Sequence, residues 1–286
     1  MYPMNKIRFL LLFLFATMVV SAQNTDDKKY LLTSKTNTIG ISTLSFVDPY
    51  LSPLTYDGLA ISYDNEARRF LSTENTNIST QSLLNLQAGI LLNTPVSSDM
   101  LYLGANYGWE MCYHAVIPIK GLKVLVGGLL DIDFGFKNME RNVNNPVNLD
   151  ISTNLNLSAL ARYTIPLRHK TLQLQLALQT PVIGYMFVPK AGASYYEMFD
   201  LGNLTDAFHF SSLYNKRGLN STLTVEVPFN RSVWRFGLKM KILRYSANDL
   251  VFDKNEFSLL VGTSFDTFNF AGRKNKAPKN FVSTQD

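Results

Sequence analysis

The sequence holds only one cysteine, Cys112, in 286 residues. A single cysteine cannot form an internal disulfide, so the fold must be held by its core and its hydrogen bonds. Beyond the first residues the chain also lacks any run of about 18 apolar residues, which excludes a bundle of membrane-spanning helices. A membrane β-barrel stays open, because lipid-facing and lumen-facing residues alternate along its strands.

Motifs for chemistry are equally scarce. The chain has three histidines and shows no zinc-ligand spacing, no glycine-rich phosphate loop and no nucleophile elbow. Asp131 and Asp133 are two like carboxylates on one segment, which is not a metal motif. The formal net charge is +5, but the excess gathers in "GRKNKAPKN" near the end, and no basic stripe with interleaved aromatics occurs elsewhere. We therefore expect no metal, no cofactor and no nucleic-acid partner.

The first residues have the features of a secretion signal. Lys6 and Arg8 form a positive start, "FLLLFLFATMVV" is a short apolar stretch, and "VSAQ" offers small residues before a cleavage point. The pattern predicts a signal peptide at 1–22 and export of the rest of the chain. The alternative is an uncleaved anchor helix, which the shortness of the apolar stretch and the polar residues after it disfavour.

What the sequence does contain is an alternation of apolar and polar residues. In "LDISTNLNLSALARYTI", 149–165, one parity is apolar except for Thr153, and the other holds mostly serine and asparagine together with Asp150 and Arg162. No convincing helical period appears in the exported part. The alternation predicts ten strands, at roughly 36–47, 58–71, 79–92, 100–117, 122–137, 147–165, 171–187, 218–228, 233–245 and 256–268.

These segments are too long for a small soluble β-protein. Soluble strands average about five or six residues, whereas tilted transmembrane strands need about nine to eleven. Short turns such as "PIKGLK" alternate with longer connections, the longest from Pro189 to Gly218, as in barrels with short periplasmic turns and long outer loops. We predict an all-β fold, an antiparallel transmembrane β-barrel of about ten strands (range about 8–12), with its polar parity facing the lumen.

The predicted organisation has four parts. A signal peptide at 1–22 precedes a periplasmic N-terminal segment at 23–35, the outer-membrane β-barrel at 36–270 and a basic disordered tail at 271–286. The alternative fold is a secreted soluble sandwich or lipocalin-like barrel that binds an apolar ligand, in which the polar parity would face solvent.

Acids and bases from different strands stand on the polar parity. A ten-stranded barrel is narrow enough for side chains to fill, and buried charges need partners. We therefore predict a salt-bridged plug; the alternative is a small-solute pore lined by opposed charges. The expected lumen charge network comprises Glu66, Arg68, Glu110, His114, Asp131, Asp133, Arg162, Glu226, Arg235, Lys239 and Lys241.

The stretch "DPYLSPLTYDGLAISYDNEARRFLS", 48–72, carries a family resemblance. It resembles the domain-of-unknown-function family 3316, exported Bacteroides-type proteins with an early Asp-x-Tyr-Leu-Ser-Pro-Leu-x-Tyr-x-Gly pattern. The resemblance implies an exported protein of outer-membrane character and brings no catalytic residues with it. The matching positions are Asp48, Tyr50, Leu51, Ser52, Pro53, Leu54, Tyr56 and Gly58.

The same stretch has a physical interpretation. Pro49 and Pro53 disfavour a regular central strand. Tyr50, Leu51 and Tyr56 give the segment apolar surface to bury. A packed turn joining two strands is the simplest interpretation. The alternatives are an outer loop folded over the mouth of the barrel and a short constriction inside the lumen.

One pair of residues suggests chemistry. His209 and Ser211, in "HFSSLYN", resemble the His-x-Ser element of outer-membrane phospholipase A. Ser212 and Leu213 follow where that enzyme has Asn-Gly, so packing within a loop is the simpler interpretation.

The expected function is an outer-membrane β-barrel without enzymatic activity, acting as a structural protein or in narrow small-solute transport. Its expected partners are outer-membrane lipid and a small polar solute. Two alternatives remain, a barrel lipid hydrolase that uses His209 and Ser211, and the secreted soluble barrel with an apolar ligand.

Overall fold

The computed structural model describes residues 30–143, 145–168, 170–200, 203–229, 232–268 and 280–284. The predicted signal peptide and most of the predicted N-terminal segment lie outside these residues. Ten long antiparallel strands dominate the fold. They are β2 (Thr33–Asp48), β3 (Ser52–Phe70), β4 (Ile78–Asn93), β5 (Ser98–Ala115), β6 (Leu122–Asn138), β7 (Val147–Pro166), β8 (Thr171–Phe187), β10 (Lys216–Phe229), β11 (Ser232–Ala247) and β12 (Leu250–Thr267).

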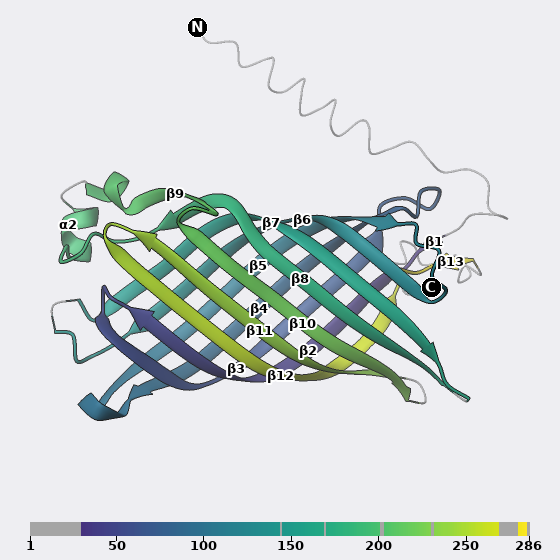
Figure 1. Cartoon of the computed structure of the whole chain (residues 1–286), viewed down its shortest axis with the longest axis horizontal. Coiled ribbons are helices and arrows are strands. Elements are labelled where there is room, and N and C mark those ends of the chain that lie inside the picture. Colours follow the sequence, from purple (N-terminus) through teal and green to yellow (C-terminus); the bar gives the residue numbers. More distant parts are fainter. Residues whose placement is uncertain are drawn as a thin grey trace, which may run out of the picture.

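The ten strands close into a barrel (Figure 1). Consecutive strands pair along the chain, β12 pairs with β2, and β10 pairs with β8, so the sheet returns to itself. The predicted antiparallel barrel of about ten strands is confirmed, and each predicted strand overlaps an observed one. The largest differences are at two strand starts: β3 begins at Ser52 instead of residue 58, and β12 begins at Leu250 instead of residue 256.

The two ends of the barrel differ (Figure 1). One end carries the short strands β1 (Tyr30–Leu31) and β13 (Phe281–Val282), and we name it the terminal end. The other, named the loop end, carries α2 (Tyr195–Phe199) and β9 (Phe208–Ser212). The 3-10 helices are η1 (Thr94–Val96) and η2 (Asn203–Ala207). Within the described part of the chain, no helix has the length and apolar character needed to span a membrane.

The C-terminal tail differs from its prediction as a disordered segment over 271–286. Residues 280–284 are ordered, because β13 pairs in parallel with β1 and because two hydroxyls bind the barrel wall. Ser283 Oγ donates to Asp266 Oδ2 over 2.9 Å, and Thr284 Oγ1 donates to Ser34 Oγ over 3.1 Å. The remainder of the predicted tail, 271–279 and 285–286, lies outside the described residues.

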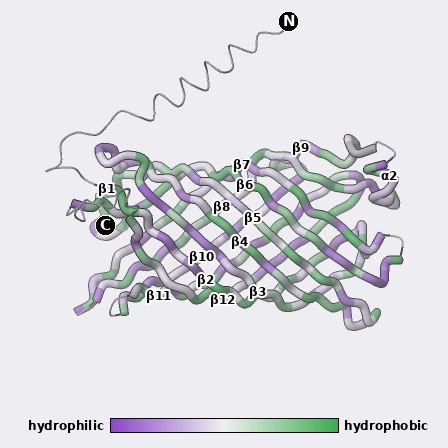
Figure 2. Tube along the Cα trace, turned by 180° about the vertical axis from the view of Figure 1, so that it is seen from behind, coloured by the Kyte–Doolittle hydropathy of each residue, from purple (hydrophilic) through white to green (hydrophobic). Residues whose placement is uncertain are grey.

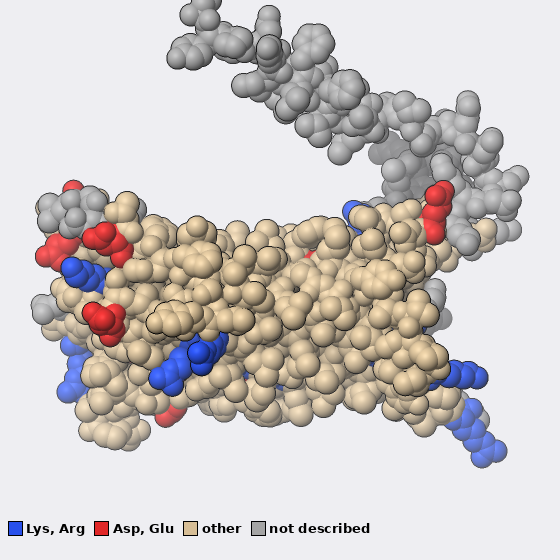
Figure 3. All heavy atoms as spheres, turned by 45° about the horizontal axis from the view of Figure 1, so that its top comes forward, with Lys and Arg blue, Asp and Glu red and all other residues tan. Residues whose placement is uncertain are grey.

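Hydrophilic and hydrophobic residues alternate along the strands (Figure 2). On β6, Leu130, Ile132 and Phe134 are 56%, 55% and 45% exposed, while Asp131 between them is 9% exposed. Polar side chains therefore face the lumen and apolar ones the outside. On the face of the barrel that Figure 3 shows, few charged side chains lie in the middle, and most Lys, Arg, Asp and Glu lie toward the ends.

An apolar cluster fills the lumen at the loop end. Phe46 and Tyr102 meet edge to face with ring centroids 4.8 Å apart, and Tyr245 stacks on Phe252 at 4.7 Å. Aromatic pairs in these geometries stabilise a core beyond the area they bury. The buried members are Leu44, Phe46, Tyr50, Leu51, Tyr56, Ala60, Leu91, Met100, Tyr102, Met139, Met186, Val188, Leu250 and Phe252.

Candidate functional site: the charged lumen

The lumen near the terminal end contains an ion pair between two strands. Arg68 on β3 donates from Nη2 to Glu110 Oε2 on β5 over 3.0 Å, and the two side chains are 8% and 5% exposed. The same nitrogen donates to Gln81 on β4. A buried charge is costly without a partner, so each of these two side chains needs the other.

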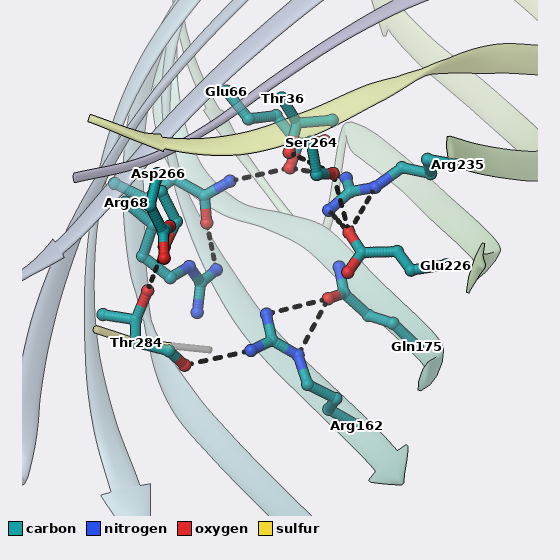
Figure 4. A network of polar contacts seen from close by, with 12 residues as sticks. Thr36, Glu66, Arg68, Arg162, Gln175, Glu226, Arg235, Ser264, Asp266 and Thr284 are labelled. Carbon is teal, nitrogen blue, oxygen red and sulfur yellow. Dashed lines mark hydrogen bonds and ion pairs between the residues drawn. The ribbon is translucent and has the colours of Figure 1, made fainter. Parts of the chain in front are cut away.

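Arg235 on β11 binds two acids (Figure 4). Its Nε and Nη2 donate to Glu226 Oε1 over 2.9 and 2.5 Å, and its Nη1 donates to Glu66 Oε2 over 3.0 Å. Ser264 Oγ also donates to Glu226 Oε1, over 2.9 Å. Glu226 faces Arg235 directly in the strand register. Glu66 lies on β3, and its side chain reaches Arg235 within the lumen past the two intervening strands, β12 and β2.

Arg162 on β7 is buried without a carboxylate within salt-bridge distance among the described residues. Its Nε and Nη2 donate to Gln175 Oε1 over 3.3 and 3.1 Å, and its Nη1 donates to the carbonyl oxygen of Thr284 over 3.0 Å (Figure 4). The C-terminal segment thus supplies the hydrogen-bond acceptor for Nη1 of Arg162. We name Arg68, Arg162 and Arg235, with their partners and Thr284, the terminal closure.

The middle of the lumen holds pairs that are less tightly buried. Lys239 Nζ lies 3.1 Å from Asp64 Oδ1, and Lys241 Nζ lies 3.6 Å from Asp133 Oδ1. Asp131 is held by neutral groups, since Asn154 donates to it over 2.7 Å and Asn156 over 2.9 Å.

A cavity of about 140 Å³ lies among these residues, and we name it the central chamber. Four atoms of residues that line it are buried without a hydrogen-bond partner in the described part of the chain. They are Asp64 Oδ2, Arg68 Nη1, Asn220 Oδ1 and Thr224 Oγ1. Such a polar space is large enough for several water molecules or a small polar solute.

A buried ionic group at the loop end centres on Asp48, the first residue of the family motif. Asp48 Oδ2 accepts from Lys137 Nζ and from Asn148 Nδ2, both over 2.8 Å, and its Oδ1 accepts from the backbone N–H of Tyr50 over 3.2 Å. Lys137 Nζ also donates to Asp150 Oδ1 over 2.9 Å. We name this ionic group, with the apolar cluster around it, the loop-end closure.

The structure also explains why other positions of the motif hold the residues that they do. The turn at 49–51 folds Tyr50 and Leu51 inward, and Tyr50 donates its hydroxyl to the carbonyl oxygen of Ala193 over 2.8 Å. Burial, followed by the charges of Asp48 and Glu197, raises the pKa of Tyr50 to about 12, so this hydroxyl keeps its proton. The segment is thus a packed turn that joins β2 and β3, the simplest of the interpretations that the sequence offered.

Two further motif positions follow from strand pairing. Pro53 lies where the register of β2 and β3 shifts, so no ladder needs its missing N–H. A side chain on Gly58 would place its Cβ 2.0 Å from the carbonyl oxygen of Ile90, so glycine is required for the close approach of β3 and β4.

Among the described residues, no hydrogen bond or ion pair joins His114 or His209 to the ionic groups. His114 shares a 2.8 Å hydrogen bond with Ser79 Oγ, and its ring lies 5.1 Å from that of Phe70. His209 and Ser211 lie on β9 with no hydrogen bond between them, and His209 Nε2 has no partner among the described residues. No group of three or more His, Cys, Asp or Glu side chains that could hold a metal occurs in the described residues.

Several lumen charges were not predicted. Lys137 has the parity of Asp131 and Asp133 on the same strand, and that parity could have revealed it. Lys216 and Lys254 lie just outside the predicted strands, so their parity was not considered. Asp64 and Glu256 also face the lumen and pair with or stand near its lysines. The predicted members Glu66, Arg68, Glu110, Glu226 and Arg235 are brought into contact in pairs, as are Asp133 and Lys241.

Fold and lumen together define a closed antiparallel β-barrel with an ionic interior and an apolar exterior. The chain belongs to the family described as protein of unknown function (DUF3316), whose model matches residues 7–274. The resemblance seen in the motif is thereby confirmed over nearly the whole chain. No curated protein matches the chain.

Solved barrels are similar to this chain only in outline. The transport unit of the autotransporter AIDA-I from Escherichia coli has a TM-score of 0.43 and 9% identity, over 94% of this chain and 100% of that one. The translocator domain of the autotransporter NalP from Neisseria meningitidis has a TM-score of 0.36 and 8% identity, over 91% and 95%. The COG4313 outer membrane channel from Pseudomonas putida F1 has 0.31 and 10%, over 86% and 100%. These values carry no inference about function.

Proposed function

We propose that this protein is an outer-membrane β-barrel, without enzymatic activity, whose lumen is closed in its resting state. The main supporting observation is that the barrel reverses the arrangement of a soluble protein: charged side chains are buried in the lumen, and apolar side chains are exposed on the outer surface. Arg235 is 4% exposed and Glu110 is 4% exposed, whereas Ile41 is 64% and Ile61 63% exposed.

The membrane location rests on this outer surface. Soluble monomers rarely expose apolar patches beyond a few hundred Å². Here each of the ten long strands carries exposed large apolar side chains, and on the face shown in Figure 3 most charges lie toward the two ends. Closure of the sheet gives each of the ten long strands a paired neighbour on both sides, which suits a lipid environment. The longest connection, 188–215, lies at the loop end, and long loops are typical of the outer side of such barrels, so the terminal end faces the periplasm.

The closed state rests on the two closures. At the terminal end, three arginines and their partners cross the lumen, and Thr284 covers Arg162. At the loop end, Lys137 joins Asp48 and Asp150 above an apolar cluster. These ion pairs are costly to separate, because a charged side chain that loses its partner remains buried where water solvates it poorly.

Three measurements test this proposal. The protein should fractionate with outer membranes, migrate faster on a gel before heating than after, and give little steady conductance in planar bilayers. Recovery as a detergent-free soluble protein would contradict the membrane location and favour the apolar-ligand barrel. Large steady conductance would contradict the closed lumen and favour a porin.

Narrow transport of a small polar solute is the second candidate function. It is favoured by the central chamber and by the four unpartnered polar atoms of residues that line it. Passage would require at least one closure to rearrange. Vesicles containing the protein should then release a small polar solute faster when a closure is weakened by substitution than when both are intact.

A further inference from the structure

The barrel wall is interrupted at one seam, between β8 and β10. β8 pairs with β10 over 173–179 and with β9 over 183–187. Residues 180–182 of β8 have no paired partner on this side. A side-chain hydrogen bond from Thr180 Oγ1 to the carbonyl oxygen of Gly218, 2.8 Å long, bridges the seam. The wall here lacks the ladder that holds it elsewhere.

Two residue types account for this interruption. Pro181 has no backbone N–H to contribute to a ladder. Gly218 faces it, and a Cβ on this residue would lie 3.4 Å from Pro181 Cδ and 3.1 Å from the carbonyl oxygen of Ile242. The wall is therefore closed by the proximity of a proline ring to a glycine, and parting them breaks few hydrogen bonds.

The central chamber reaches this seam. Its lining includes Pro181 and Gly218 and also Leu178, Leu219 and Ile242. These last three side chains are 37%, 39% and 45% exposed on the apolar outer face. One continuous cavity is thus lined by lumen charges on one side and by outer-face apolar residues on the other.

Lys216 lies at the lumen side of the seam, and its ammonium group makes fewer hydrogen bonds than it can donate. Lys216 is 4% exposed, and its Nζ donates to Ser152 Oγ over 2.9 Å and to Asn154 Oδ1 over 2.7 Å. An ammonium has three donors, so one makes no hydrogen bond among the described residues, and the ring centroid of Tyr245 lies 6.0 Å from Nζ. Among the described residues no carboxylate lies within 4.0 Å of Lys216. Asp131 and Asp133 stand behind Asn154, which donates to both.

We propose that the seam is a lateral binding site for a single-chain anionic amphiphile, such as a fatty carboxylate. The anionic head lies against Lys216 in the central chamber, and the chain passes between Pro181 and Gly218 to the outer face. This inference rests on the proposed membrane location and goes beyond it, because a ligand that arrives from the lipid needs neither closure to open.

Photolabelling tests the site directly. The full chain is refolded in phosphatidylcholine vesicles with a fatty carboxylate that carries a diazirine in mid-chain, irradiated and mapped by mass spectrometry. Adducts on Leu178, Leu219 and Ile242 should exceed those on Leu59 and Ile61 of β3 by about fivefold, although the two β3 residues are more exposed on the outer face. Excess dodecanoate should remove this enrichment, and its methyl ester should not.

Two variants act on different parts of the site. Lys216→Gln removes the charge while keeping the length of a polar side chain, and Gly218→Val fills the seam. Each should reduce the enrichment to the level of β3. The matched controls are Lys120→Gln, in an exposed turn, and Gly128→Val, where an added Cβ meets nothing closer than 3.9 Å; both should label as the natural chain does.

The outcomes separate this proposal from the membrane location. Equal labelling of β3 and the seam would overturn the amphiphile site and leave the membrane barrel standing. Unchanged enrichment in Lys216→Gln would also overturn it, even if Gly218→Val failed to fold. Absence of adducts from the whole outer face would overturn the membrane location and this site together.

Discussion

Lys137 on β6 and Asp48 at the end of β2 form an ion pair of 2.8 Å between Nζ and Oδ2, with side chains 5% and 0% exposed. The two residues are 89 positions apart in the sequence. Lys137 also binds Asp150, so one ammonium joins three strands above the lumen. This contact gives the first residue of the family motif a structural role at the mouth of the barrel.

The first prediction concerns that contact. Asp48→Asn keeps the shape of the side chain but removes its charge, so Lys137 retains only Asp150. We expect the free energy of unfolding to fall by about 1–3 kcal/mol, the cost of weakening a buried charge-assisted hydrogen bond. Denaturant titration of the protein in lipid vesicles measures it. Asp57→Asn, at an exposed position, is the control and should change little. Equal stability of the two variants would contradict the role of Asp48.

Arg235 allows a second prediction. Arg235→Met leaves Glu226 and Glu66 without their shared partner, so unfolding should become easier by about 3–5 kcal/mol. Adding Glu226→Gln should restore part of this loss, because it removes one stranded charge. If adding Glu226→Gln to Arg235→Met lowered the free energy of unfolding by as much as Glu226→Gln does alone, the two residues would be acting independently.

Two acids of the lumen should differ in importance. Glu110 is 5% exposed at its side chain and lies 3.0 Å from Arg68, whereas Asp133 is 27% exposed and lies 3.6 Å from Lys241. Glu110→Ala should therefore lower the free energy of unfolding by about 3 kcal/mol. Asp133→Ala should lower it by about 1 kcal/mol or less, as for a partly solvated pair. The reverse order in the same denaturant titration would show that burial does not govern these pairs.

The close approach of β3 and β4 gives a fourth prediction. Gly58→Val places a side chain against the carbonyl oxygen of Ile90, and we expect a loss of about 1–3 kcal/mol from strained packing, or failure to refold. Gly128→Val on β6, where an added Cβ would meet its nearest neighbours at 3.9 Å, is the matched control. The temperature at which heat changes gel migration compares the two. No difference between them would contradict the steric role of Gly58.

Alternation was sufficient to predict the ten strands and the direction of their faces. A period of two assigns each side chain to the lumen or the outside, whatever the partner strand. It could not predict which charges meet, because strand register and closure decide that. Glu66 and Arg235 are 169 positions apart and meet only because β12 pairs with β2 and so completes the wall between them.

Strand boundaries limited the predicted site. The strands extend beyond the apolar pattern at the loop end, where Lys216 and Lys254 enter the lumen ahead of the predicted starts at 218 and 256. The order of residues 280–284 had no signal in composition, because it comes from pairing with β1 and from contacts with Asp266 and Arg162. The seam at Pro181 could not be predicted because it requires the β8–β10 register.

The last prediction uses Cys112 as a reporter of the terminal closure. This thiol is 2% exposed and faces the lumen on β5, two residues from Glu110. Removal of residues 280–286 takes away the carbonyl oxygen that Arg162 binds and the hydroxyls that bind Asp266 and Ser34. With each lost hydrogen bond contributing about 1 kcal/mol, the closure should open more often, and a water-soluble maleimide should label Cys112 about tenfold faster.

The control for this experiment is Lys120→Gln, which changes the charge of a neighbouring turn and keeps the tail; its labelling rate should equal that of the natural chain. Planar-bilayer conductance of the truncated protein should stay low, because the loop-end closure remains intact. Combining the truncation with Asp48→Asn should raise conductance more than either change alone, since solute must pass both closures. Unchanged labelling of Cys112 after truncation would show that the C-terminal segment does not cover the lumen.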